Sequence, residues 1–66
     1  MKYVVCYILN DGTVHDWTIH NSLEVALKWT YYWLLYDSYL NSCKIYKVGT
    51  DLHLEISEIY KGGESK

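Results

Sequence analysis

The feature that most constrains the fold is the segment 28–40, in which six of thirteen side chains are Tyr or Trp and none is Phe. At about 100° per residue, a helix through this segment carries apolar side chains on two sides. One stripe consists of Val25, Trp29, Tyr32, Trp33, Tyr36 and Leu40, and the other of Leu23, Leu27, Tyr31 and Leu34. A single sheet covers only one side of a helix, so the other stripe predicts contact with something else.

Strand patterns flank this helix on both sides. Residues 2–9 and 13–20 are rich in Tyr, Val, Ile and Trp, and Asn10-Asp11-Gly12 between them is a hairpin signal. Residues 43–48 and 52–60 form a second strand pair around a turn at 49–51. The sequence therefore predicts an α+β fold of the type ββαββ, in which a four-stranded antiparallel sheet of two hairpins packs against one central helix. It leaves the strand order open.

Finer details of the elements can also be predicted. A loop at residues 10–12, preferred over one at 11–12, places the odd side chains of the first strand on one face with His15, Trp17 and Ile19. The helix is expected to begin at Asn21 or Ser22, with Asn21 as the N-cap in a capping box with Glu24, and to end near Asn41. The last strand is expected to be two-faced. Its two faces are Leu52, Leu54 and Ile56, and His53, Glu55 and Ser57.

The length of sixty-six residues allows one small domain, and we expect it at residues 1–61, followed by a flexible polar tail at 62–66. Such a domain buries only about 60% of its unfolded surface and usually needs a disulfide, a metal, self-association or a bulky core. Cys6 and Cys43 lack the spacing of a zinc knuckle or a disulfide scaffold. We therefore expect reduced thiols that pack as small apolar groups, rather than a Cys6–Cys43 bridge.

No motif indicates catalysis, a metal or a cofactor. His15 and Asp16 are adjacent, but neighbouring strand residues point to opposite faces, so we expect them not to act as a pair. His20 and His53 show no metal-ligand spacing, the serines and cysteines no nucleophile motif, and the glycines no phosphate loop. The prediction is a protein that is not an enzyme and that holds no cofactor and no metal.

Charge and hydropathy restrict the partners. Aromatic side chains on a sheet could stack single-stranded nucleic acid, but the chain has six lysines, no arginine, eight carboxylates and a net charge of −2, which argues against it. The longest apolar helical run, residues 29–36, is far shorter than the ~20 residues of a membrane span. No leader pattern is visible, so a cytoplasmic location is expected.

The remaining hypothesis is stoichiometric binding of a partner through Tyr and Trp. These residues are favoured where one end of the side chain is buried and the other end reaches water or a partner. Three alternatives stay open for the aromatic helix: core alone, core plus a homodimer interface, and core plus a surface for a foreign protein. The runner-up function is a planar small molecule or nucleotide stacked on Trp29, Trp33 and Tyr36. The candidate partner- or ligand-binding residues are Leu23, Leu27, Trp29, Tyr31, Trp33, Leu34 and Tyr36.

The composition also suggests a source. The chain contains no Arg and no Pro but much Ile, Lys, Asn and Tyr. This composition is typical of an AT-rich coding sequence, as in a low-GC bacterium or its phages. By analogy of size and character alone, small domains without catalytic motifs include phage-encoded inhibitors of host proteins. We therefore expect a small inhibitor encoded by a phage or another mobile element.

Overall fold

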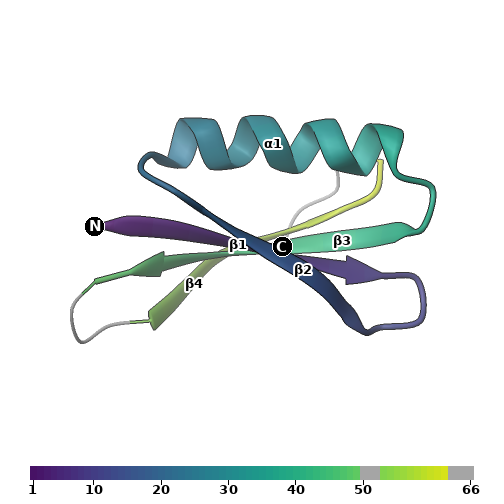
Figure 1. Ribbon diagram of the computed structural model, residues 1–66, viewed down its shortest axis with the longest axis horizontal. Coiled ribbons are helices and arrows are strands. Elements are labelled where there is room, and N and C mark those ends of the chain that lie inside the picture. The colour runs from purple at the N-terminus through teal and green to yellow at the C-terminus, as the bar shows by residue number, and fades with distance from the viewer. Residues whose placement is uncertain (50–52, 63–66) are drawn as a thin grey trace.

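The computed structural model describes residues 1–49 and 53–62, which form one sheet with a helix lying across one of its faces (Figure 1). The elements are β1 (Lys2–Leu9), β2 (Val14–His20), α1 (Leu23–Tyr36), β3 (Leu40–Val48) and β4 (His53–Tyr60). All neighbouring strands are antiparallel, in the order β2-β1-β3-β4. The predicted α+β fold with the order ββαββ is confirmed, and its two hairpins join through β1 and β3. Residues 63–66 of the predicted tail and residues 50–52 around the second turn lie outside the described residues.

The helix contacts the sheet through a narrow stripe of mostly small side chains. Ala26, Thr30 and Leu34 are buried, and Leu27 packs partly against the same core. The Thr30 hydroxyl donates a hydrogen bond to the carbonyl oxygen of Ala26 at 2.8 Å, which satisfies a polar group in an apolar layer. The sheet contributes Val5, Tyr7, Leu40, Cys43, Ile45 and Ile59. Tyr7 is the one aromatic residue among the buried residues of the described chain, so the aromatic side chains of α1 do not form the core.

The first hairpin turns through the loop that the sequence predicts. The Leu9 N–H donates to the Thr13 carbonyl oxygen at 2.8 Å, and Asn10, Asp11 and Gly12 lie between them. Gly12 has φ +89°, in the left-handed region that disfavours side chains with a Cβ atom.

Replacing Gly12 therefore tests the loop. We expect Gly12→Ala to lower the free energy of unfolding by about 1–2 kcal/mol, because the left-handed backbone conformation disfavours a residue with a Cβ atom. The added Cβ has no neighbour within 4 Å, so no new contact offsets this loss. Gly12→Asn should lose less, because Asn tolerates this conformation better than Ala. Urea denaturation measures both variants, and equal losses would contradict the explanation.

A β-bulge at His15 changes the register of the same hairpin. The pairs on its two sides are Ile8 with Val14 and Tyr7 with Asp16. The extra residue inverts the faces beyond it, so that Val5 pairs with Thr18, and Trp17 and Ile19 lie on the other side of the sheet. The prediction that Trp17 and Ile19 share the face of Val5 is therefore wrong, although the loop length behind it is right.

Both ends of α1 differ from the preferred prediction. Ser22 is the N-cap, its Oγ accepting the Val25 N–H at 3.2 Å, so the predicted Asn21 cap and its capping box with Glu24 are wrong by one residue. The helix ends at Tyr36, well before Asn41, because the Asp37 side chain accepts the Tyr39 N–H at 3.0 Å and turns the chain. Leu40 then enters β3 and is only 1% exposed.

A second bulge interrupts the alternation predicted for the last strand. Ile45 pairs with Ser57 and Tyr46 with Glu55, which leaves Ile56 unpaired. Leu54 and Ile56 remain 50% and 37% exposed. The strand is therefore not two-faced over its whole length.

Candidate partner-binding surfaces

Four aromatic rings of α1 form a continuous cluster, which we call the aromatic helix surface: Trp29, Tyr32, Trp33 and Tyr36. Tyr32 lies at its centre, with ring centroids 5.4 Å from Trp29, 5.0 Å from Trp33 and 4.9 Å from Tyr36. The two Trp contacts are edge-to-face, the favoured arrangement for aromatic pairs. The rings nevertheless remain between 41% and 69% exposed, so they pack on one another rather than on the sheet.

The candidate residues from the sequence separate into two groups in the structure. Trp29, Tyr31, Trp33 and Tyr36 are exposed and Leu23 is at 36% exposure, whereas Leu27 packs against the core and Leu34 is only 4% exposed. The last two therefore stabilise the helix–sheet layer. Sequence reasoning left Tyr32 out of the candidate residues, although its spacing of three and four residues from Trp29 and Tyr36 indicates contact along a helix.

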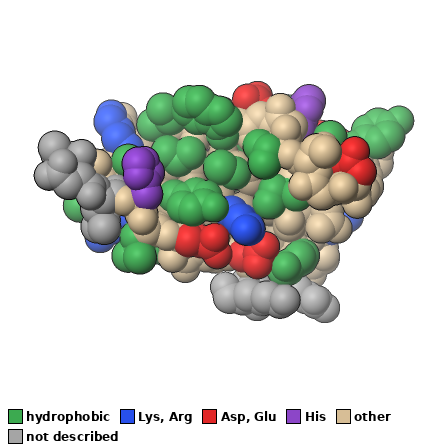
Figure 2. Space-filling view, turned by 90° about the horizontal axis from the view of Figure 1, so that it is seen from below, with side chains coloured by type: hydrophobic (Ala, Val, Ile, Leu, Met, Phe, Trp, Pro, Cys, Tyr) green, Lys and Arg blue, Asp and Glu red, His purple; other side chains and the backbone are tan. Residues whose placement is uncertain are grey.

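The sheet face opposite α1 is a second apolar surface, which we call the open sheet face (Figure 2). A shallow hollow on it is lined by Val4, Cys6, Trp17, Tyr46, Val48 and His53. Trp17 and Ile19 are 54% and 55% exposed, because the bulge at His15 turns them away from the helix. Lys44 and Glu55 form an ion pair at 3.8 Å, and Figure 2 shows charged side chains along one border of the green side chains.

The two cysteines lie on opposite faces of the sheet and are both free, as expected. Burial raises the pKa of the Cys43 thiol from 9.0 to about 12. Burial also raises the pKa of Cys6, and nearby Lys44 partly offsets this effect. Neither thiol therefore has the lowered pKa of a reactive cysteine.

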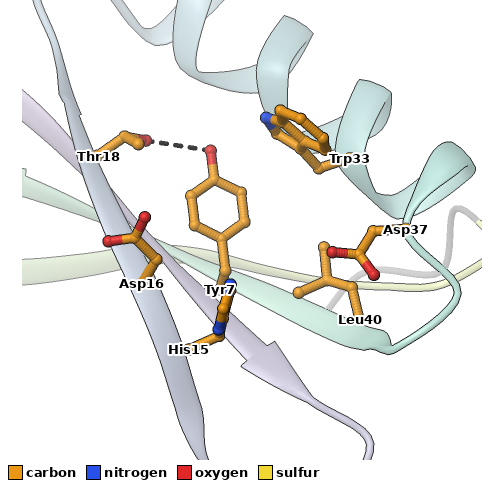
Figure 3. A pocket seen from close by; sticks show the side chains of 7 residues that line it. All are labelled: Tyr7, His15, Asp16, Thr18, Trp33, Asp37 and Leu40. Carbon is orange, nitrogen blue, oxygen red and sulfur yellow. Dashed lines mark hydrogen bonds between the residues drawn. The ribbon is translucent and has the colours of Figure 1, made fainter.

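A cavity of about 240 Å³ lies between α1 and the first hairpin (Figure 3). Its lining residues are Tyr7, His15, Asp16, Thr18, Trp33, Asp37 and Leu40. The Tyr7 hydroxyl and Thr18 Oγ1 are 3.0 Å apart, and Thr18 Oγ1 is 2.8 Å from His20 Nε2. We call this space the helix–hairpin cavity.

The cavity contradicts the premise that His15 and Asp16 point to opposite faces of the sheet. His15 and Asp16 both line it, whereas strict strand alternation would place them on opposite faces. The physical reason is the bulge, which sets two residues of β2 against one residue of β1. Within residues 1–49 and 53–62, no group of three or more His, Cys, Asp or Glu side chains is placed to hold a metal ion.

Comparison with family models, curated proteins and solved structures gives no match. In the described part of the chain, no helix has both the length and the apolar character to cross a membrane. The function must therefore be inferred from the surfaces and the cavity themselves.

Proposed function

We propose that the protein is a non-catalytic protein-binding domain that uses the aromatic helix surface to contact another protein. The observation that carries this proposal is that Trp29, Trp33 and Tyr36 pack edge-to-face or tilted against Tyr32 while the four residues stay 41–69% exposed. A core role does not account for them, because the sheet is packed by Ala26, Thr30 and Leu34 instead.

The chemistry of these rings suits a protein partner. Tyr and Trp combine a large apolar body with a polar tip, and they are enriched at the centres of protein interfaces. These mutual ring contacts restrict the side chains before binding, so that less side-chain entropy is lost on association. The surface is thus prepared for contact in the free protein.

The biological setting is part of the same proposal. We infer a small inhibitor of a host protein, encoded by a phage or mobile element of a low-GC bacterium. Its support is compositional, from a sixty-six-residue chain without Arg or Pro. An inhibitor acts by occupying a surface of its target, which requires a binding face and no catalytic residue.

Self-association is proposed through the open sheet face rather than through the leucines of α1. Leu34 is buried and Leu27 partly buried, whereas Trp17 and Ile19 are more than half exposed on a face that no described element covers. An apolar centre with polar side chains at the border is the usual composition of a protein interface. This face leaves the aromatic helix surface free for a foreign partner, because the two lie on opposite layers (Figure 1).

The runner-up function, a planar ligand stacked on three aromatic rings, has weaker support. The helix–hairpin cavity is lined by Trp33 but by neither Trp29 nor Tyr36. Asp16 and Asp37 also face it, and their carboxylates would repel the phosphates of a nucleotide.

The test uses capture from a low-GC bacterial lysate, followed by affinity measurement with the purified captured protein. We expect the double variant Tyr32→Ala, Tyr36→Ala to weaken the complex by about tenfold or more, as truncation of aromatic hot spots does. Tyr39→Ala is the matched control, because Tyr39 is 75% exposed and belongs to none of the three ring contacts. Equal affinities of the double variant and the wild type would overturn the proposal.

Light scattering over a concentration series tests self-association separately. We expect a wild-type dimer, a monomer for Trp17→Ser, Ile19→Thr, and a dimer for Tyr32→Ala, Tyr36→Ala. A monomeric wild type, or dissociation only in the helix variant, would contradict the assignment of the open sheet face.

A further inference from the structure

Two carboxylates face the helix–hairpin cavity from different elements (Figure 3). Asp16 comes from the bulged part of β2, and Asp37 from the C-cap of α1. Asp16 Oδ1 accepts the Trp17 N–H at 2.7 Å, and Asp37 Oδ1 accepts the Tyr39 N–H at 3.0 Å. These bonds orient both carboxylates and use only one oxygen of each, so the other oxygen remains available to a ligand.

No described cation forms an ion pair with either carboxylate. Within residues 1–49 and 53–62, the one ion pair joins Lys44 and Glu55. Lys61 approaches the end of α1, but its Nζ donates to the main-chain oxygen of Asp37 at 2.8 Å and makes no ion pair with the carboxylate. The cavity therefore holds two acidic groups that have no ion-pair partner among the described residues.

Aromatic groups complete the lining. Tyr7 is only 6% exposed, and its ring stands inside the cavity below its bond to Thr18. Trp33 lines the cavity from the helix side, one helical turn before Asp37. The faces of Trp and Tyr rings attract cations within about 6 Å of the ring centre, and carboxylates nearby add to this attraction.

We propose that the helix–hairpin cavity binds an organic cation, namely an alkylammonium or guanidinium group. Its volume of about 240 Å³ is below the ~300–1,000 Å³ typical of drug-sized ligands, which suits one cationic head group with a short alkyl chain. Such a group is supplied either by a free amine or by a Lys or Arg side chain of a protein.

The cavity and the aromatic helix surface share one residue, Trp33. A Lys or Arg side chain of a bound protein could therefore enter the cavity while its neighbours contact the aromatic rings. If the cation is a side chain of a bound protein, this inference rests on the proposed function and adds that the partner carries a basic residue at the interface. Binding of a free cation rests only on the cavity and does not depend on the proposed function.

The experiment is a ¹H–¹⁵N NMR titration of the isolated protein at pH 8. n-Butylguanidinium is the probe, and n-butylurea is its neutral, planar control of nearly the same shape. The reporters are the Trp33 indole N–H and the backbone N–H groups of Trp17 and Tyr39, which contact the two carboxylates. We expect saturable shifts at these reporters with the guanidinium and none with the urea.

Asp16→Asn and Asp37→Asn test the carboxylates without losing local structure, because the Asn side-chain oxygen still accepts the same backbone N–H. Each should weaken n-butylguanidinium binding by about fivefold or more, as expected for a charge-assisted contact that is partly exposed to solvent. Glu24→Gln is the control, since it removes one carboxylate in the first turn of α1, away from the cavity. Equal shifts with n-butylurea, or unchanged binding in both Asp variants, would overturn the proposal.

A peptide distinguishes the two sources. Tighter binding of acetyl-Gly-Arg-Gly-amide than of n-butylguanidinium assigns the cavity to a protein side chain, and weaker binding assigns it to a free cation. Failure of every cation at the cavity would leave the result of the Tyr32→Ala, Tyr36→Ala capture experiment unaffected. The two proposals therefore fail separately.

Discussion

Leu34→Ala should unfold a large fraction of the protein, whereas Leu35→Ala should change its stability little. The two leucines are neighbours in α1, but Leu34 is 4% exposed and Leu35 is 74% exposed. Removing a buried Leu side chain costs about 2–5 kcal/mol, because apolar contacts are lost and a cavity remains. A domain of this size has a total stability of only about 0.05–0.15 kcal/mol per residue.

Urea denaturation followed by circular dichroism measures both variants under the same conditions. Leu35→Ala should stay within about 0.5 kcal/mol of the wild type, as surface substitutions usually do. This pair is well matched because both changes delete the same atoms from the same helix. Equal losses would show that α1 is rotated about its axis from the orientation described above.

The second large effect is a loss of stability in alkali. Burial raises the pKa of Cys43 from 9.0 to about 12, so between these values the unfolded chain releases a proton that the folded chain retains. The free energy of unfolding then falls with rising pH, by at most about 1.4 kcal/mol per pH unit from this group. Below pH 9 this contribution is fully present. Burial also raises the pKa of Tyr7, which acts in the same direction above pH 10.

Cys43→Ala isolates the thiol. We expect this variant to be less stable than the wild type at pH 8, because a buried side chain is shortened. Its stability should decline less steeply between pH 9 and 10.5, because the thiol no longer ionises on unfolding. Urea denaturation at several pH values measures both slopes, and equal slopes would contradict a buried, protonated Cys43.

The arrangement of elements could be predicted because each has a local signal. Residues 2–9 are rich in Tyr, Val and Ile, which favour strands, the loop contains Gly12 at a positive φ, and the N-cap lies one residue from the predicted Asn21. No local sequence signal marks the bulge at His15, because the first hairpin could form in either register. Only the match between whole faces of the sheet decides which side Trp17 and Ile19 take.

The orientation of α1 could not be read from periodicity because apolar residues surround the helix. Size alone would favour the large aromatic side chains as the core, yet Ala26 and Thr30 face the sheet and allow α1 to approach it closely. Leu40 continued the apolar helical pattern and therefore concealed the end of the helix at Tyr36. The helix–hairpin cavity could not be predicted from the sequence for the same reasons, because it depends on both the bulge at His15 and the turn at Asp37.

The bulge at His15 has a consequence for how this protein can change in evolution. Deleting the codon for His15 would make Val14 and Asp16 neighbours, and their pairs with Ile8 and Tyr7 would then form an uninterrupted ladder. Trp17 and Ile19 would stay on the open sheet face, and Asp16 and Thr18 would stay on the side of α1. The length of β2 can therefore change by one residue at the bulge without altering which side chains either face presents.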